Sequence, residues 1–505
     1  MSYDALRTST KVTRRHVTKL LGLAPFAVSG VFRSFALPPT VDSKLDLVSS
    51  NRQLAEAFRW AKQQALAYVF EGDPVGPYYE AALPGRQAFC MRDTAHQVNG
   101  ALALGLARWN HNMLRRFAEN ISESRDWCSY WEIDRLNRPA PVDYKNDKQF
   151  WYNLPANYDV LDACYRMFLW ARDESYINDP VFLNFYDRTI VDYTARWSLS
   201  PDRIMQRTSN IQEPPYFRGD PTYEESSRDN LIGIDLLATQ YAAFRAYAAI
   251  QAIRGNIKVS REALRTADEI KTLINTKWWN TTQGYYYAFF NKQHQFTGRA
   301  GADVLYHDAA DSGEKTESAL ETLLATQRSE PADAVEAKSH YAEILYRYGR
   351  ASEAYEQIVD LSRESRARRE YPEVSYSVID ALVTGLMGIA IEPAVAATDL
   401  TPTPFKPIVA TLPALNAPTD WVELSNLPLL GGTVSIRHQG NSGTSFTNHG
   451  SVPLQWKPAF PGFLKSMKID GNPSPAYIIP SFSGQVLTGP VLSVAPGRTL
   501  RANAN

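Results

Sequence analysis

The sequence has few cysteines and no excess of either charge, and both features exclude classes of protein. Its three cysteines, Cys90, Cys128 and Cys164, form no CxxC pair and no Cys/His spacing of a zinc site, and they allow one disulfide bond at most. The formal net charge is −1, without a run of Lys or Arg that would attract nucleic acid. We therefore expect no disulfide framework, no nucleic-acid partner, no metal site and no cofactor.

The sequence also lacks an apolar run long enough to cross a membrane comfortably. Arg14 and Arg15 precede an apolar stretch over 20–32, which small residues near Ala36 follow. This pattern looks like a twin-arginine export signal, and a transmembrane helix needs roughly 20 apolar residues. We expect 1–36 to be a bacterial export signal and the mature protein to be periplasmic or secreted, without stable membrane insertion. The alternatives are a basic amphipathic N-terminus and an uncleaved anchor.

Apolar residues recur at helical spacing in about a dozen segments between residues 50 and 391, which predicts a mainly α protein. Every second segment is more apolar than its neighbours, as if an inner ring of helices alternated with a wetter outer ring. Consecutive antiparallel helices then bring all loops before inner helices to one rim. We expect an (α/α)6 barrel over 45–391. The more apolar segments are 95–106, 160–169, 231–249, 302–306, 341–348 and 374–391.

The composition and the period change after Ile391. Residues 392–418 are rich in Ala, Pro and Thr, which is typical of a linker. Short alternating strands such as 421–424 and 433–437 follow, separated by Gly, Asn and Pro. We expect a small antiparallel, β-sandwich-like domain over 419–505. It is either a stabilising cap or a carbohydrate-binding domain.

The expected rim loops combine carboxylates, arginines and aromatic residues. A helix that begins near Asp93 places residues i, i+3 and i+4 on one face, where polar groups need partners such as sugar hydroxyls. The loop over 125–155 has Trp and Tyr beside carboxylates, as a saccharide subsite does. The alternatives are a cap with an ion pair at 92–93 and aromatic residues that belong to the core. The expected substrate-binding residues are Arg92, Asp93, His96, Gln97, Trp131, Glu132, Trp151, Tyr152, Arg228 and Tyr371.

Two acidic clusters precede two of the inner helices. Glu225 and Asp229 lie in the first cluster, and Glu370 and Glu373 lie in the second. Carboxylates this close together are costly unless they are solvated, paired or used. The two clusters start helices on opposite sides of the expected ring, so their carboxylates would face each other across a central pocket. That arrangement suits glycoside hydrolysis.

This combination resembles the six-hairpin glycosidases, and in particular the group of trehalases and glycoside hydrolase family 63. The motif Glu-Ser-Ser-Arg-Asp-Asn at 225–230 is similar to the Glu-Ser motif before helix six in that group, whose Asp acts as acid. Glu370 or Glu373 stands where a Glu before helix twelve acts as base. The resemblance covers about 50–391. Arg228 replaces the usual aromatic residue or Gly, and the motif around the base differs from that of the group.

The resemblance implies a glycoside hydrolase that acts on oligo- or polysaccharides by inversion. The N-terminal segment adds the expectation that the enzyme is exported. Asp229 would be the general acid, with Glu225 as the next candidate. Glu373 would be the base in preference to Glu370, which Arg368 or Arg369 can neutralise.

The alternatives are a glucuronidase, a polysaccharide lyase on the same scaffold and a non-catalytic glycan-binding barrel. A lyase would abstract a proton with His96, His340 or Tyr371. The sequence indicates neither the sugar and linkage nor the oligomeric state.

Overall fold

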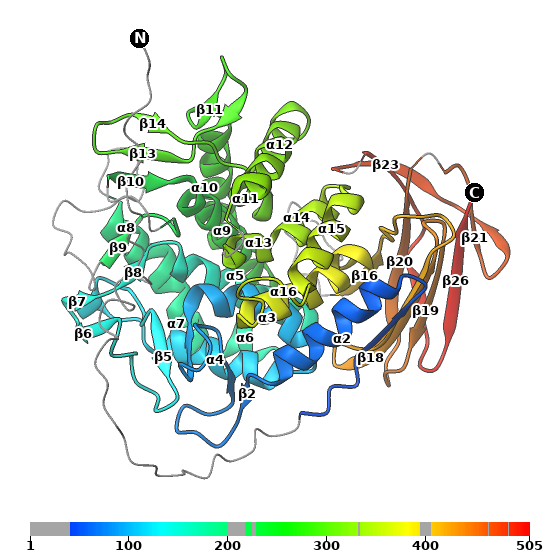
Figure 1. Cartoon of the computed structure of the whole chain (residues 1–505), viewed down its shortest axis with the longest axis horizontal. Coiled ribbons are helices and arrows are strands. Elements are labelled where there is room, and N and C mark those ends of the chain that lie inside the picture. The colour runs from blue at the N-terminus through cyan, green and yellow to red at the C-terminus, as the bar shows by residue number, and fades with distance from the viewer. Residues whose placement is uncertain are drawn as a thin grey trace.

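The structure is a computed structural model that describes residues 41–198, 218–224, 229–331, 334–393, 406–462, 464–482 and 484–505. A helical body is followed along the chain by two β-sheets, which lie on the right in Figure 1. The prediction of a mainly helical body with β-sheets at its C-terminal end is thus confirmed. The expected export signal lies outside the described residues. Every described helix is too short or too polar to cross a lipid bilayer.

Six inner helices form a closed ring. Each inner helix contacts the next one in chain order, and the contact between the last two is made mainly by η3, which packs on α14. The ring closes because α16, the last inner helix, packs on α3, the first. All of them overlap the more apolar segments of the sequence. The inner helices are α3 (Met91–Ala103), α5 (Ala156–Ala171), α9 (Ile234–Ile253), α11 (Ala302–Tyr306), α14 (Tyr341–Arg347) and α16 (Pro372–Asp380), which the π-helix η3 (Ala381–Leu386) continues.

Outer helices alternate with the inner ones along the chain. All except α7, which packs on α4, pack against inner helices. They are α2 (Arg52–Leu66), α4 (Ala107–Glu119), α7 (Pro180–Asp187), α10 (Ile257–Thr276), α12 (Glu314–Ser329) and α15 (Ala351–Ser362). The shorter helical segments are η1 (Glu123–Arg125), α6 (Ser175–Asn178), η2 (Arg188–Tyr193), α8 (Thr194–Trp197) and α13 (Val335–Ser339).

Burial explains why inner and outer helices differ in composition. Of the 20 residues of α9, 15 are buried, so nearly every side of the helix must be apolar. The next helix, α10, buries Ala263, Ala267, Ile270 and Ile274, which recur every three or four residues on one face. The other faces of α10 carry Lys, Arg and Glu and meet solvent. The apolar content of a segment therefore indicates its place in the ring.

Short strands occupy the loops that precede the inner helices. They form small sheets that fix the starts of α3, α5, α9 and α11, and β8 and β9 pair in parallel. The strands are β2 (Val69–Phe70), β3 (Tyr78–Tyr79), β4 (Ala88–Cys90), β5 (Glu132–Asp134), β6 (Tyr144–Asn146), β7 (Gln149–Phe150), β8 (Tyr152–Asn153), β9 (Arg218–Asp220), β10 (Asn230–Gly233), β11 (Trp279–Asn280), β12 (Tyr285–Tyr286), β13 (Phe289–Asn291) and β14 (Phe296–Thr297).

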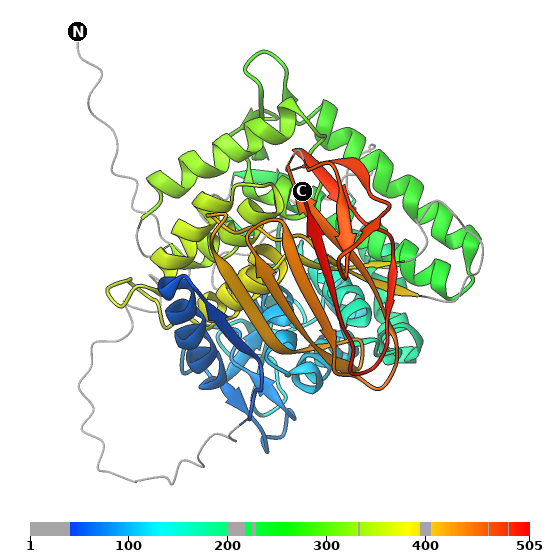
Figure 2. The ribbon, with the colours of Figure 1, turned by 90° about the vertical axis from the view of Figure 1, so that its right-hand side faces the viewer.

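Two larger sheets pack beside the helical body, and Figure 2 shows them in front of it. One has the order β1 (Asp46–Ser49), β17 (Trp421–Leu429), β18 (Gly432–Gln439), β19 (Gly443–Asn448), β26 (Thr499–Ala504), β21 (Met467–Ile469) and β22 (Asn472–Ser474). The other has the order β15 (Ile389–Pro393), β16 (Pro407–Thr411), β20 (Leu454–Pro461), β24 (Gly484–Thr488) and β23 (Tyr477–Ser481), and β25 (Leu492–Val494) also pairs with β20. Trp456 stacks on Phe446 in the core, with ring centroids 5.3 Å apart.

The sheets differ from the expected antiparallel domain in three respects. Strand β1 precedes the helical body but pairs with β17, so the sheet includes residues from before the expected boundary at 419. Strand β16 lies within 392–418, the expected linker, and buries Val409. It also runs parallel to β20. The Pro- and Ala-rich composition of 392–418 predicts a linker. The strand within it could not be predicted, because pairing between distant strands leaves no pattern in the local sequence.

Candidate active site

Polar side chains from the N-terminal ends of several inner helices meet at one end of the ring. Inner helices that run in the same direction bring their first turns together, so residues far apart in the sequence become neighbours. We call this group the central polar cluster. It comprises Arg92, Asp93 and His96 of α3; Asp159 of α5; Tyr223 between β9 and β10; Tyr306 and His307 at the end of α11; His340 before α14; and Tyr371 and Glu373 at the start of α16.

Glu373 lies at the centre of the cluster, between two histidines. Its Oε1 is 2.7 Å from His340 Nε2 and 3.1 Å from His96 Nδ1. The side chain is 1% exposed, and Oε2 has no hydrogen-bond partner among the described residues. Burial favours the neutral carboxyl, but the hydrogen bonds and charges of His340 and His96 outweigh it and hold the pKa of Glu373 below its ordinary value. Glu373 is therefore ionised at neutral pH, and one oxygen is left for a further partner.

The two histidines differ in how readily they take up a proton. Their ring centroids are 4.4 Å apart, so protonation of one disfavours protonation of the other. Burial lowers the pKa of His96 to about 4, and the neighbouring His340 acts in the same direction. Burial also opposes the charged form of His340, but the hydrogen bond and charge of Glu373 prevail and raise its pKa. A proton is therefore held more readily by His340 than by His96.

Asp159 lies on the other side of the His96 ring. Its Oδ2 is 3.9 Å from His96 Nε2, and its Oδ1 is 3.9 Å from His307 Nε2. Burial raises the pKa of Asp159 to about 7, although Tyr223, which donates a hydrogen bond to Oδ2, opposes the shift. Glu373 and Asp159 thus flank one imidazole.

Asp235, in the first turn of α9, fixes the position of Tyr223. Its Oδ2 accepts hydrogen bonds from Thr222 Oγ1 at 2.9 Å and from the Tyr223 backbone nitrogen at 2.6 Å. Burial raises the pKa of Asp235 to about 8. The guanidinium of Arg92 lies 5.5 Å from the centroid of the Tyr223 ring. A continuous polar path therefore leads from α9 through Tyr223 to Asp159.

Arg92 and Asp93 form an ion pair beside Glu373. Arg92 Nη2 lies 3.1 Å from Asp93 Oδ1, and the hydroxyl of Tyr371 donates to Asp93 Oδ2 at 2.7 Å. Arg92 remains 16% exposed. The cluster thus offers an ionised carboxylate, Glu373, and a carboxyl group that is partly neutral near pH 7, Asp159. Charged and neutral hydrogen-bond donors surround these two groups. These groups can move a proton in each direction.

Of the residues that we expected at the site, Arg92, Asp93, His96, Tyr371 and Glu373 come together in this cluster. Gln97 of the same helix is fully buried, and its amide has no hydrogen-bond partner among the described residues.

Two other expected carboxylates are exposed to solvent. Asp229 is exposed at the start of β10, where its carbonyl accepts a hydrogen bond from the Lys292 backbone nitrogen. Glu370 is exposed, and its carbonyl accepts a hydrogen bond from Tyr68. Arg368, one of the two expected partners of Glu370, pairs with Glu336. Glu225 and Arg228 lie outside the described residues.

The expected aromatic binding residues are buried. The ring centroids of Trp131 and Tyr223 are 6.4 Å apart. Trp151 donates a hydrogen bond to Asn153 Oδ1 at 2.8 Å, and Tyr152 donates a hydrogen bond to Asn157. Glu132 forms an ion pair with Arg86 at 3.0 Å. The polar composition of their loop favoured exposure, but short strands fold these side chains inward.

Several members of the cluster were not among the expected site residues, namely Asp159, Tyr223, Tyr306 and His307. His340 was expected only as a candidate base of a lyase. Asp159 could have been identified in the same way as Asp93, because each is an acidic residue in the first turn of an apolar helix. His340 likewise precedes an inner helix. Tyr223 and Tyr306 carry no comparable signal, because aromatic residues near helix ends are common in any large core.

Among the described residues, one group of side chains has donor atoms close enough together to hold a metal ion. His96, His340 and Glu373 each offer one ligand atom, and these atoms lie within 4.8 Å of one another. All three cysteines are buried and unbridged.

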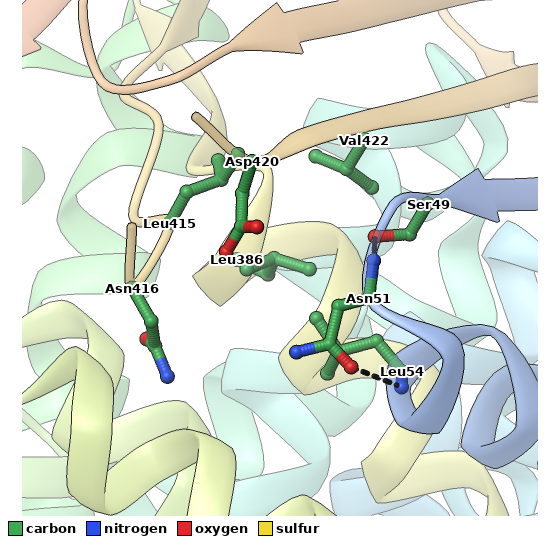
Figure 3. A pocket seen from close by; sticks show the side chains of 8 residues that line it. All are labelled: Ser49, Asn51, Leu54, Leu386, Leu415, Asn416, Asp420 and Val422. Carbon is green, nitrogen blue, oxygen red and sulfur yellow. Dashed lines mark hydrogen bonds between the residues drawn. The ribbon is translucent and has the colours of Figure 1, made fainter. Parts of the chain in front are cut away.

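A small cleft lies at the opposite end of α16 and η3, between the helical body and the sheets (Figure 3). Leu386, which lines it, follows Glu373 by 13 residues, about 20 Å along a helix. Its lining residues are Ser49, Asn51, Leu54, Leu386, Leu415, Asn416, Asp420 and Val422. With a single carboxylate and no basic side chain, the lining offers little for catalysis.

No protein family matches the sequence, and neither does any curated protein. Solved structures match its fold. The α-L-rhamnosidase from Dictyoglumus thermophilum is 13% identical, with a TM-score of 0.58 over 92% of this chain and 50% of that one. A sialidase is 11% identical, with a TM-score of 0.57 over 94% and 44%. The GH78 family rhamnosidase of Bacillus sp. GL1 is 10% identical, with a TM-score of 0.52 over 80% and 40%. The chain thus spans about half the length of these proteins, and the likeness concerns the fold alone.

Proposed function

We propose that the chain is a glycoside hydrolase on an (α/α)6 barrel of six helical hairpins, and that it cleaves oligo- or polysaccharides with inversion. The observation that carries the proposal is the position of Glu373, an ionised and buried carboxylate across the His96 ring from Asp159. An inverting reaction needs one ionised carboxylate as base and one protonated carboxyl group as acid. The likeness of fold to two rhamnosidases supports the same class of reaction.

Glu373 is the general base of the proposed reaction. Its Oε2 accepts a proton from water as the water oxygen bonds to the anomeric carbon. The bond between that carbon and the glycosidic oxygen breaks, and the general acid gives its proton to the departing oxygen. His340 and His96 bind Oε1 and so hold the carboxylate in place while Oε2 reacts.

Two described carboxyl groups are candidates for the general acid. Asp229 is the candidate of the sequence motif and remains one. We favour Asp159, because contacts through His96 and Tyr223 link it to the cluster that contains the base. Asp235 then acts as a positioning residue, because it holds Tyr223 against Asp159.

The substrate class is carbohydrate, and α-L-rhamnosides are the first compounds to test, because two of the structural neighbours are rhamnosidases. Arg92 and Asp93 would bind hydroxyl groups of the sugar beside the base. We further propose that residues 1–36 direct export, so that the enzyme acts in the periplasm or outside the cell.

One observation favours a second candidate. His96 and His340 lie with ring centroids 4.4 Å apart next to Arg92, and such a pair could remove a proton beside a uronate carboxylate. A polysaccharide lyase would use this chemistry, and its unsaturated product absorbs ultraviolet light. A glucuronidase would bind the same uronate through Arg92 but would release a saturated sugar.

The proposal is tested by incubating the purified protein with aryl glycosides, α-L-rhamnosides first, and with plant and bacterial oligosaccharides and uronides. We expect the release of a saturated sugar by the wild type and almost none by Glu373→Gln. An ultraviolet-absorbing product would favour the lyase. If wild type and variant released equal amounts from every substrate, Glu373 would not be the base.

A further inference from the structure

We infer that His96, His340 and Glu373 form a binding site for one divalent transition-metal ion such as Zn²⁺, and that the bound ion inhibits hydrolysis. The donor atoms are His96 Nδ1, His340 Nε2 and a carboxylate oxygen of Glu373, all within 4.8 Å of one another. Two histidines and one glutamate around an open fourth position is an established arrangement of zinc ligands.

The position of the carboxylate supports the site. Glu373 Oε1 already lies 2.7 and 3.1 Å from the two ring nitrogens. Release to solvent of the protons on these nitrogens, with small shifts of the three side chains, would bring the donors around one ion. Oε2 is buried and has no hydrogen-bond partner among the described residues, although such oxygens are normally paired. An ion bound between the three residues would satisfy this carboxylate.

The donor types indicate which ions fit. Imidazole nitrogens suit Zn²⁺, Cu²⁺ and Ni²⁺, whereas Mg²⁺ and Ca²⁺ prefer oxygen ligands in larger number. The second nitrogen of His96 faces Asp159 Oδ2 at 3.9 Å. A carboxylate behind a metal-bound histidine is a common supporting arrangement.

The two histidines give the site limited access to solvent. The side chains of His96 and His340 are 13% and 12% exposed, whereas Glu373 is almost fully buried beneath them. An ion could therefore enter past the two rings, and water could complete its coordination.

Inhibition follows from the role of Glu373 and rests on the proposed function. A carboxylate that binds a cation no longer accepts a proton readily from water, and the ion occupies the space beside the base. Binding of the ion itself does not depend on that role, so the two parts of the inference are tested separately.

Binding is measured first. Protein freed of metal and of any histidine tag is titrated with Zn²⁺ in competition with a chromogenic chelator. We expect one ion per chain, with affinity lowered at least about tenfold in Glu373→Gln and in His340→Gln. His449→Gln is the matched control, because it removes a histidine that binds Ser435 in the β-sheets, and it should leave the affinity unchanged.

X-ray absorption of the zinc-loaded wild type provides a readout that does not rely on the variants. Two imidazole nitrogens at about 2.0–2.1 Å and a carboxylate oxygen at about 2.0–2.2 Å are expected. A wild type that binds no ion, or Glu373→Gln protein that binds as tightly as wild type, would overturn the site.

Inhibition is measured on a glycoside that the wild type hydrolyses. We expect Zn²⁺ to abolish turnover over the concentration range in which it binds, and a chelator to restore it. Stimulation by Zn²⁺ would overturn the inhibitory role while leaving the site intact. If no glycoside is hydrolysed, the proposed function fails, whereas the chelator titration still decides whether the metal site exists.

Discussion

The carboxylate of Glu373 accepts a hydrogen bond from His340 across 2.7 Å, and this contact joins the start of α16 to the start of α14. The two residues are 33 positions apart in the sequence. The contact keeps a buried carboxylate ionised, which a general base requires.

Replacing Glu373 by Gln should lower the rate of hydrolysis on the order of 10²- to 10⁴-fold with little loss of fold, because the amide cannot accept a proton from water. Azide should partly restore the rate by attacking from the face of the base. The measurement is kcat on one aryl glycoside, with and without azide. Glu370→Gln is the matched control, since Glu370 is exposed and should be dispensable. Normal turnover by Glu373→Gln would remove Glu373 from the mechanism.

Asp159→Asn should slow hydrolysis of an unactivated glycoside by a similar factor, because the leaving oxygen then receives no proton. A good leaving group needs little protonation, so an activated aryl glycoside should recover much of the rate. The two substrates are compared for Asp159→Asn and for Asp229→Asn. If only the Asp229 variant shows this pattern, the acid is the residue of the sequence motif rather than Asp159.

Removal of metal should not slow the enzyme. The proposed reaction uses two carboxyl groups, and an ion at His96 and His340 would compete with the base. We therefore expect EDTA to leave the rate unchanged or to raise it. A rate that EDTA abolishes and that added Zn²⁺ or Ca²⁺ restores would contradict this account of Glu373.

Replacing Arg14 and Arg15 by Lys should retain the precursor in the cytoplasm. The twin-arginine receptor reads the guanidinium pair, and Lys keeps only the charge. Cell fractionation followed by immunoblotting measures the distribution. Equal export of the wild-type and Lys forms would show that this segment is not a twin-arginine signal.

The free energy of unfolding should depend on pH through His438, which links the sheets to the helical body. Its ring is fully buried and lies 3.0 Å from the carbonyl of Met387 and 2.9 Å from Thr444 Oγ1. Burial lowers its pKa to about 4, against about 6.5 in the unfolded chain. Between these values the unfolded chain binds more protons, so stability rises with pH, by up to about 3 kcal/mol in total.

Urea unfolding of the wild type and His438→Gln at several pH values tests this dependence. The variant should be less stable at pH 7 and should lose much of the change between about pH 4 and 6.5. An unchanged slope would assign the dependence to other groups. His294→Gln, at an exposed histidine, serves as the control.

Part of this architecture follows from local patterns in the sequence. The apolar content of α9 against the one-sided pattern of α10 indicates which helix is inner, because burial on all sides requires apolar residues on all sides. Asp93 and Glu373 were identified because each is an acidic residue in the first turn of an apolar helix.

Other features depend on contacts between distant segments and could not be predicted from local patterns. The pairing of Glu373 with His340 and His96 requires the ring to close. Strand β1 finds its partner more than 370 positions later in the chain, and nothing near Asp46 indicates this. Trp151 and Tyr152 were expected to bind substrate because their loop is polar, but both side chains are buried in the core.

The central claim is that Glu373 activates water for an inverting displacement, and the anomeric configuration of the first product tests it most directly. Proton NMR, recorded during hydrolysis of a glycoside of known configuration, shows the product before it mutarotates. The account predicts that the sugar released by the wild type has the inverted configuration and that Glu373→Gln releases almost none. A product of retained configuration would contradict the account, because retention requires a carboxylate that attacks the sugar directly.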